Sequence, residues 1–342
     1  MPYEPFDLVE LGGTGLRVTR LGFGAGSIAG LYTPVDDADA VSVVRHAWQI
    51  GVRLFDAAPL YGFGAGERRL GVGLAGLPRD AFVLSTKVGR LVRSADTIAP
   101  GTEVDRQAIG DVEDAFFADT RGRRMVFDYS ADGIRRSVEE SLRRLGLDRL
   151  DIVFIHDPDD HWEAAIGQAY PALHRMREEG LVRAIGVGMN QAAMLGRFAR
   201  EGDFDVFLVA NRYTLLDHDA LAELLPLCRA RGIAVLIGGV MNTGVLVGAR
   251  PDSRFDYRPV PADVLERARR LAAVCERHDV PLRAAAVQFP LAHPAVTGLI
   301  VGVRSREHLD DYPSLMRRVI PAALWAELRD EGLIPPEAPT PP

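Results

Sequence analysis

Four polar residues of this sequence have types and positions that suit proton transfer. Three of them directly end apolar runs that are typical of buried strands, and the fourth lies five residues beyond one of these runs. They are Asp56 after "VRLF", Lys87 after "FVLST", His156 after "IVFI", and Tyr61. In a parallel barrel the catalytic groups gather at the carboxyl ends of the strands, so we expect the four side chains to lie close together.

The chemistry of these residue types is coherent. A phenol with a pKa near 10 is a poor proton donor at neutral pH. We expect the Lys87 ammonium to lower the pKa of Tyr61, while the Asp56 carboxylate keeps that ammonium charged. The His156 imidazole can donate a hydrogen bond to a substrate oxygen. Together the four residues indicate a proton relay to one oxygen atom, which suits carbonyl reduction or alcohol oxidation with a hydride carrier.

Composition supports a special role for Lys87. It is the single lysine among 40 basic residues, and the others are arginines. An arginine would serve badly at this position because its guanidinium is bulky, planar and barely able to share a proton. Each residue also has an ordinary interpretation: Asp56 as a turn or capping residue, Tyr61 as a loop aromatic, and His156 as a polar strand end. Their joint occurrence at strand ends favours the functional interpretation.

The elements that would position these residues follow a strand–helix rhythm. Eight apolar runs are predicted strands: residues 20–24, 52–56, 82–87, 150–156, 183–187, 206–210, 234–238 and 297–301. Runs such as "DIVFI" and "AVLIGG" are apolar throughout instead of alternating, which is typical of parallel strands buried on both faces. Amphipathic helices with glycine ends separate them. The pattern favours an α/β fold of the (β/α)8 TIM-barrel type, with a doubly wound sheet as the alternative.

Three segments fall outside this rhythm. Residues 8–24, "LVELGGTGLRVTRLGFG", predict an N-terminal β-hairpin. The polar stretch 91–127 predicts a long loop insertion after the third strand, and the proline-rich end, about 334–342, predicts a disordered tail. No linker divides the chain, so we expect residues 1–342 to form one barrel domain.

Composition also excludes several classes of protein. The net charge of −7 without a long basic run argues against nucleic-acid binding. No apolar run is long enough to span a membrane, and the start "MPYEPFDLVE" is unlike a signal peptide. Cys228 and Cys275 lie in helical-looking segments and predict buried thiols. We therefore expect a cytoplasmic enzyme that acts on a small molecule without a metal ion; the oligomeric state stays open.

Five motifs occur in order over nearly the whole chain: "FDAAPLYGFGAGERRLG", "VLSTKVG", "DIVFIHDPD", "GVGMNQ" and "GLIVGVRSREHL". With these motifs the sequence resembles the aldo-keto reductase superfamily. The resemblance implies a (β/α)8 barrel, closed at one end by the hairpin, that binds a nicotinamide dinucleotide without a Rossmann fold. It also implies a catalytic tetrad, with Tyr61 as the general acid and base: Asp56, Tyr61, Lys87 and His156.

The same resemblance implies a set of cofactor-binding residues. Asn190 and Asn211 would contact the nicotinamide carboxamide, and Gly24 would lie near the cofactor. The remaining implied contacts follow the seventh and eighth strands: Gly239, Met241, Gly302, Arg304, Ser305 and His308.

Two departures from the family pattern affect the cofactor. Gly238 and Gly239 stand where the family usually has a tyrosine that stacks on the nicotinamide. Gly302 and His308 stand where NADP-preferring members carry a lysine and an arginine for the 2′-phosphate. The loss of two cations weakens phosphate binding, so we expect NAD, while Arg304 leaves NADP as the alternative.

Three motifs resemble those of the sugar-oxidising branch of the family: "AAPLYGFGAGERRLG", "NRYTLLDH" and "GGVMNTGVL". The expected reaction is oxidation of an aldose at C1 to the lactone, and oxidation of pyridoxal or general aldehyde and ketone reduction are the alternatives. A Schiff-base lyase that uses the Lys87 amine is a remote alternative. It would need an unprotonated amine, whereas the Asp56 carboxylate favours the ammonium.

Overall fold

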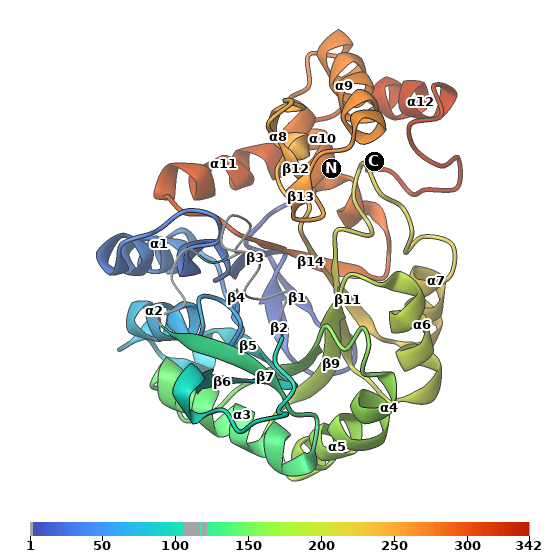
Figure 1. The fold of residues 1–342 in the computed structure, drawn as a ribbon. Helices are drawn as coiled ribbons and strands as arrows, with labels where there is room; N and C mark the ends of the chain where they lie inside the picture. The colour runs from blue at the N-terminus through green and yellow to red at the C-terminus, as the bar shows by residue number, and fades with distance from the viewer. Residues whose placement is uncertain (1–2, 106–116, 118–121, 342) are drawn as a thin grey trace.

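A closed barrel of eight parallel strands forms the centre of the protein (Figure 1). The computed structural model describes residues 3–105, 117 and 122–341. Its barrel strands are β3 (Leu21–Gly24), β4 (Leu54–Asp56), β5 (Val83–Val88), β8 (Ile152–His156), β9 (Ala184–Met189), β10 (Val206–Ala210), β11 (Ala234–Gly238) and β14 (Val296–Val301). These are the eight predicted strands, so the (β/α)8 barrel is confirmed and the doubly wound sheet is wrong.

The barrel interior is a packed core that the N-terminal hairpin closes at one end. Inward-facing side chains such as Leu54, Phe154 and Leu236 form one buried cluster with Leu11 and Leu16 of the hairpin. The hairpin itself pairs β1 (Leu8–Glu10) with β2 (Arg17–Thr19) in antiparallel register, as the sequence predicted. Since this end is plugged, only the carboxyl ends of the strands are open for a binding site.

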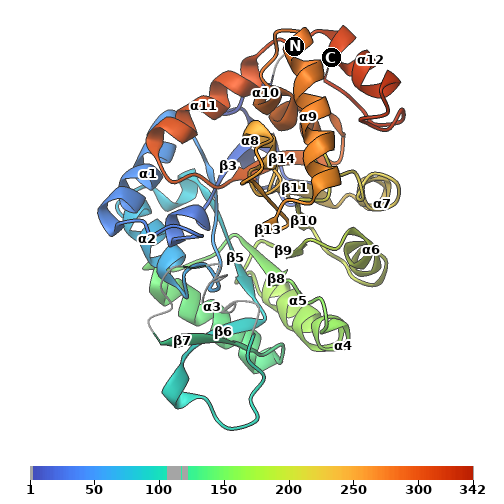
Figure 2. The same ribbon diagram turned by 45° about the horizontal axis from the view of Figure 1, so that its top comes forward.

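Helices surround the barrel and cover its outer face (Figure 2). They are α1 (Asp37–Ile50), α2 (Ala65–Leu74), α3 (Ala131–Leu145), α4 (Trp162–Ala164), α5 (Tyr170–Glu178), α6 (Ala192–Glu201), α7 (Leu224–Arg231), α8 (Val245–Gly248), α9 (Ala262–Arg277), α10 (Leu282–Gln288), α11 (Arg306–Arg317) and α12 (Ala322–Asp330). The ends of α3 illustrate why they form. The Ser130 hydroxyl caps its start by accepting from Gly133 N at 3.0 Å, and Gly146 ends it in the left-handed conformation.

The segment 91–127, predicted as a long loop, is a paired ribbon at both of its ends. Strand β6 (Arg90–Ser94) runs antiparallel to β7 (Arg123–Phe127), with Leu91 opposite Val126. Leu91, Met125 and Val126 are buried, whereas Arg93, Arg123 and Arg124 are partly exposed. These arginines hid the strand signal because they lowered the hydropathy of both short runs. The rest of the predicted loop lies mainly outside the described residues.

The proline-rich end was also predicted wrongly, because residues 334–341 pack against the helices. Ile334 and Ala338 are 2% and 1% exposed and belong to the main hydrophobic core. Arg329 Nη2 in α12 donates to Ala338 O at 3.1 Å and to Thr340 Oγ1 at 2.9 Å. Prolines lose little conformational entropy on folding, so few contacts suffice to order such a segment.

Two further predictions concern the rest of the chain. The chain's two cysteines, Cys228 and Cys275, are both buried and free, as predicted. Among the helices of the described residues, none combines the length and the apolar character that a membrane crossing requires.

Candidate active site

Three of the predicted catalytic residues meet at the carboxyl rim of the barrel. Asp56 is the last residue of β4, Lys87 lies one residue before the end of β5, and His156 is the last residue of β8. These strands are adjacent, in the order β4–β5–β8. Lys87 Nζ donates to Asp56 Oδ2 at 2.6 Å and to Ala57 O at 2.9 Å, and Lys87 and Asp56 are 1% and 2% exposed. These two hydrogen bonds occupy the Lys87 amine group and argue against its use as a nucleophile.

The fourth residue, Tyr61, comes from the turn between β4 and α2. Gly62, Phe63 and Gly64 all have positive φ angles, 59°, 52° and 89°, so the chain reverses sharply directly after Tyr61. Lys87 Nζ lies 4.8 Å from the centre of the Tyr61 ring, and the Tyr61 and His156 rings meet edge to face at 6.0 Å. The structure thus brings together all four residues that the sequence predicted.

The electrostatics of Tyr61 differ from the prediction. Burial raises the pKa of Tyr61 well above 10, and the charges of Asp56 and Asp157 add to this effect. The expected lowering of the Tyr61 pKa by Lys87 is therefore wrong. The physical reason is that burial has the largest effect on Tyr61, and the Asp56 carboxylate, 2.6 Å from the ammonium, opposes the effect of Lys87.

His156 is shifted in the opposite sense. Burial holds the pKa of His156 well below 6.5, and the positive charges of Arg90 and Lys87 lower it further. The imidazole is consequently neutral at physiological pH. A neutral ring can donate a hydrogen bond from one nitrogen and accept with the other.

Two residues of this rim were missed in the sequence. Asp157 follows His156 directly, has a φ of 38°, and burial raises its pKa to about 6. Arg90, on β6, donates from Nη2 to Asp157 O at 3.2 Å, and its Nη1 lies 3.2 Å from Asp105 Oδ2. The motif "HDPD" placed Asp157 next to a predicted strand end, which was a usable signal. Arg90 and Asp105 gave none, because their contacts join segments distant in sequence.

Asn211, one of the two residues predicted to bind the nicotinamide carboxamide, directly follows β10 and lies beside Gly239, which directly follows β11. Asn211 is 1% exposed, and neither its Oδ1 nor its Nδ2 makes a hydrogen bond of acceptable geometry with the described residues. A Cβ added to Gly239 would lie 2.2 Å from Asn211 Oδ1, so only glycine fits beside this amide. A buried amide without partners costs free energy, about 1–3 kcal/mol per group. Asn211 is therefore suited to bind a ligand amide such as the nicotinamide carboxamide.

The other predicted cofactor residues follow the ends of β3, β9, β11 and β14, on the same rim. Gly24 ends β3, while Asn190 comes directly after β9 and Met241 shortly after β11. Arg304 and His308 are exposed at the start of α11, where the Ser305 hydroxyl caps the helix by accepting from His308 N at 3.3 Å. Helix starts favour anions because their amides are unpaired. This region fits the phosphates of a dinucleotide.

Gly302, which lies between β14 and this helix start, is exposed but lies close to the Ser27 side chain. A Cβ there would lie 2.7 Å from Ser27 Oγ, so a larger residue at position 302 would displace the Ser27 side chain.

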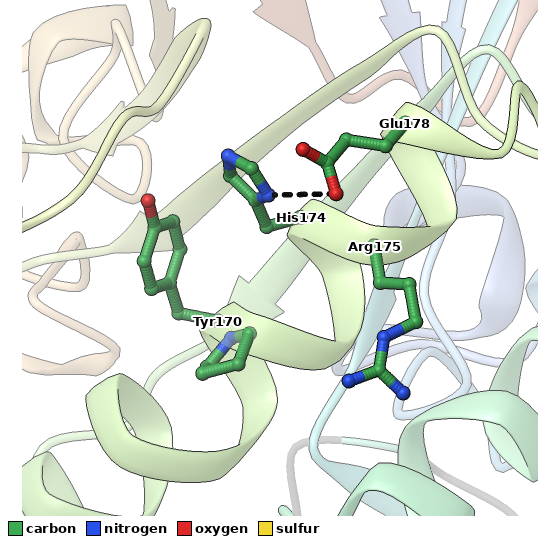
Figure 3. Close-up of a pocket in the computed structure, with 5 residues that line it drawn as sticks. Tyr170, His174, Arg175 and Glu178 are labelled. Carbon is green, nitrogen blue, oxygen red and sulfur yellow. Dashed lines mark ion pairs between the residues drawn. The ribbon is translucent and has the colours of Figure 1, made fainter.

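A surface groove on α5 is lined by residues other than those at the barrel rim (Figure 3). Tyr170, Pro171, His174, Arg175 and Glu178 line it, and His174 Nδ1 lies 3.5 Å from Glu178 Oε2. All five belong to one outer helix. None of them ends a barrel strand, so the groove does not share the rim's chemistry.

Comparisons with known proteins agree with this geometry. The sequence pattern of the Aldo/keto reductase family matches residues 20–330. The chain is 41% identical over 324 residues to D-threo-aldose 1-dehydrogenase of Pseudomonas sp., covering 94% of this chain and 96% of that protein. It is 40% identical over 338 residues to pyridoxal 4-dehydrogenase of Microbacterium luteolum, covering 95% and 97%. Among solved structures, an aldo-keto reductase of Bacillus halodurans in its holo form has the same fold, with a TM-score of 0.72, 23% identity, and coverage of 95% and 96%.

Proposed function

Because the chain belongs to the aldo/keto reductase family of nicotinamide-dependent oxidoreductases, we propose that it oxidises an aldose at C1 to the lactone, with NAD as the preferred cofactor. The observation that carries this proposal is the convergence of Tyr61 and His156 above the buried Lys87–Asp56 pair. The aldose as substrate rests on the 41% identity to D-threo-aldose 1-dehydrogenase over 94% of the chain.

In the proposed reaction, Tyr61 and His156 act on the anomeric hydroxyl of the sugar. The hydride acceptor for C1 would be the bound oxidised nicotinamide dinucleotide, which would take up the two electrons. Tyr61 Oη accepts the hydroxyl proton, and the neutral His156 imidazole donates a hydrogen bond that orients the same oxygen. Both groups must reach one atom at the same time, which their edge-to-face packing at the rim supports.

The Lys87–Asp56 pair prepares Tyr61 for this role. In the free protein Tyr61 holds its proton, because burial raises its pKa. Lys87 Nζ donates hydrogen bonds to Asp56 and to Ala57 O, and these bonds hold the ammonium near the face of the Tyr61 ring. The ammonium stabilises the phenolate that forms when Tyr61 gives up its proton before oxidation.

The residues proposed to hold the cofactor divide into two groups. Asn190 and Asn211 hold the carboxamide, with support from the buried Asn211 side chain, whose amide atoms have no well-formed hydrogen bond among the described residues. Arg304, Ser305 and His308 hold the phosphate end at the start of α11. The remaining residues proposed to line the cofactor site are Gly24, Gly239, Met241 and Gly302. Because position 302 carries no cation and His308 is not permanently charged, we infer a preference for NAD over NADP.

Oxidation of pyridoxal is the second candidate, since pyridoxal 4-dehydrogenase is 40% identical over 95% of the chain. Pyridoxal forms a cyclic hemiacetal whose hydroxyl is chemically equivalent to the anomeric hydroxyl of an aldose. The same Tyr61 and His156 roles would therefore serve either substrate.

The test is to incubate the protein with NAD or NADP and a panel of aldoses plus pyridoxal, following the absorbance of the reduced nicotinamide. Turnover of one or more aldoses with NAD is the expected result. Turnover of pyridoxal alone would transfer the proposal to the second candidate, and a strong preference for NADP would contradict the cofactor assignment. Borohydride trapping of a substrate on Lys87 would overturn the oxidoreductase mechanism.

A further inference from the structure

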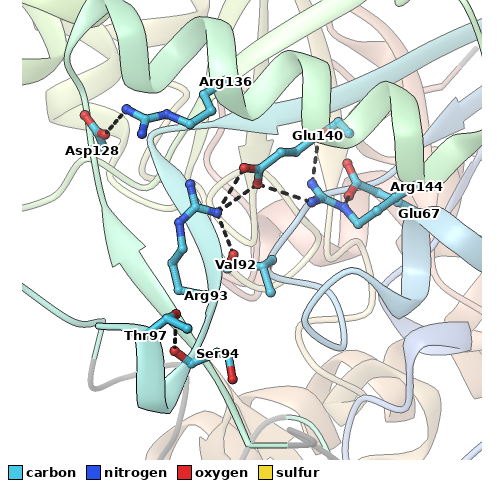
Figure 4. Close-up of polar contacts among 10 residues, drawn as sticks. Glu67, Val92, Arg93, Ser94, Thr97, Asp128, Arg136, Glu140 and Arg144 are labelled. Atoms are coloured by element: carbon cyan, nitrogen blue, oxygen red, sulfur yellow. Dashed lines mark hydrogen bonds and ion pairs between the residues drawn. The ribbon is translucent and has the colours of Figure 1, made fainter. Parts of the chain in front are cut away.

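Glu67 is a fully buried carboxylate close to the proposed catalytic residues but outside them. It lies in the first turn of α2, six residues after Tyr61, and is 0% exposed. Its Oε1 accepts from Thr86 Oγ1 at 2.7 Å. Its Oε2 accepts from Arg144 Nε at 2.5 Å (Figure 4). Both oxygens are therefore held in fixed directions by partners from two other elements.

The first partner connects Glu67 to the strand that carries Lys87. Thr86 and Lys87 are consecutive in β5, so their side chains point to opposite faces of the barrel wall. Lys87 faces the rim and Asp56, whereas Thr86 is fully buried between the wall and the helices. Glu67 thus holds β5 from outside at the position where Lys87 is held from inside.

The start of α2 is equally fixed to Tyr61. Gly66 N donates to Tyr61 O at 3.0 Å, and a Cβ on Gly66 would lie 3.1 Å from Tyr61 Cβ. The turn that carries Tyr61 and the start of α2 are therefore hydrogen-bonded and closely packed together. A shift of Glu67 relative to Thr86 would change the distance between Tyr61 and Lys87.

The second partner extends the anchor to α3 and to the ribbon. Arg144 lies 3.7 Å from Glu140 Oε2, and Glu140 accepts from Arg93 Nη1 of β6 at 3.0 Å with both oxygens (Figure 4). Arg144 Cδ also packs against Gly64, where a Cβ would lie 2.7 Å away. These ion pairs therefore connect the turn that carries Tyr61 to α3 and β6.

A buried ion pair is a poor means of gaining stability, because well-packed apolar residues often do as well or better. Such a pair does, however, fix directions. Because each oxygen of the Glu67 carboxylate has its own donor, the pair fixes the position of α2 relative to β5 and α3. We propose that Glu67, held by Thr86 and Arg144, is a positioning residue that sets the distance between Tyr61 and Lys87. The inference rests on the proposed function, since it assigns Glu67 to the proton transfer at Tyr61.

A second buried carboxylate–arginine pair, Asp151 with Arg79, lies at the opposite end of β5 and serves as a control for Glu67 and Arg144. Asp151 is 2% exposed, accepts from Arg79 Nη2 at 2.7 Å and from Leu84 N at 2.8 Å, and lies before the start of β8. It also ties β5 to its surroundings through an arginine, but at the amino end of the strands. Asp151→Asn therefore controls for the loss of a buried carboxylate–arginine pair.

The experiment compares Glu67→Gln, Thr86→Val and Asp151→Asn in the full chain with NAD and the sugar substrate. We expect Glu67→Gln to lower kcat roughly 10- to 100-fold, to leave the KM for NAD within about twofold, and to move the alkaline limb of the kcat–pH profile. Asp151→Asn should lower the melting temperature without moving that limb. If Glu67→Gln loses only thermal stability, as the Asp151 variant does, the positioning role is overturned.

Thr86→Val is the second arm, for the case in which Glu67→Gln does not fold. It removes only the hydroxyl donor and should lower kcat about 3- to 10-fold with the same change of pH profile; an unchanged profile overturns the proposal. A 3-fluorotyrosine placed at position 61 gives a readout without turnover. Its fluorine resonance should shift with Thr86→Val and not with Asp151→Asn, and equal resonances in the two variants overturn the inference. An absence of turnover in the unmodified protein would refute the proposed function alone.

Discussion

The Tyr61 and His156 rings lie edge to face, with centroids 6.0 Å apart and an interplanar angle of 87°. Burial acts on the two groups in opposite senses, because it raises the pKa of the phenol and lowers that of the imidazole. Both groups are therefore uncharged at neutral pH. In the proposed reaction, Tyr61 must therefore be ionised before it accepts a proton from the substrate hydroxyl, and the neutral His156 donates a hydrogen bond to it.

Tyr61→Phe tests the proton acceptor directly. We expect kcat to fall by about 10²- to 10⁴-fold, since general acid–base catalysis typically contributes this much. Binding of NAD, measured by quenching of protein fluorescence, should stay within about twofold, because the phenol is not among the residues proposed to hold the cofactor. Turnover that is unchanged by the substitution would contradict the role given to Tyr61.

The raised pKa of Tyr61 predicts how the oxidative rate depends on pH. Since the phenol must lose its proton to act as the base, kcat for oxidation should rise as the pH increases. Asp157→Asn removes one of the charges that raise this pKa, so its alkaline limb should lie at lower pH than that of the unmodified protein. Initial rates measured across the alkaline range for both proteins check this, and coincident limbs would refute it.

Asp157 also makes stability depend on pH. Its carboxyl pKa rises from 3.8 to about 6 on folding, so the folded state binds more protons than the unfolded state between these values. Stability is highest below the lower value and falls as the pH rises through about 6. Asp157→Asn should therefore stabilise the protein at pH 7 by no more than about 3 kcal/mol and have little effect at pH 4. Urea unfolding at the two pH values measures this difference.

His308→Arg tests the cofactor preference. A permanent cation at the start of α11 should improve NADP relative to NAD by about tenfold in kcat/KM, because a charge-assisted hydrogen bond to phosphate contributes about 1.5–3 kcal/mol. His308→Gln, which adds no charge, is the control and should leave the ratio unchanged. If both variants keep the original ratio, the 2′-phosphate does not reach this helix start.

Ile334→Ala tests whether the proline-rich end contributes to the fold. Ile334 is 2% exposed, and truncation of such a side chain costs about 2–4 kcal/mol. Val319, which is 74% exposed, provides the control: Val319→Ala should change the free energy of unfolding by less than about 0.5 kcal/mol. Equal effects of the two substitutions in urea unfolding would mean that the end is not packed.

The barrel and the four rim residues could be predicted from the sequence because they depend on local pattern. Runs such as "DIVFI" and "AVLIGG" are apolar on both faces, which only a buried parallel strand explains well. Asp56, Lys87 and His156 each end such a run, so their convergence followed once the barrel was assumed.

The remaining features depend on contacts between distant segments. Arg90 meets Asp105 and Asp157 only after folding, and no spacing in the sequence announces these pairs. The pKa of Tyr61 depends on burial and on how closely Asp56 approaches Lys87, which a list of residue types does not contain.

The burial of Lys87 has a practical consequence for the whole surface of the protein. Because the chain's single lysine is 1% exposed and paired with Asp56, no lysine side chain is accessible to amine-directed reagents. Active-ester dyes and aldehyde crosslinkers will therefore leave the folded protein's side-chain amines untouched. A lysine introduced at any chosen exposed position would become the single accessible side-chain amine for labelling or immobilisation.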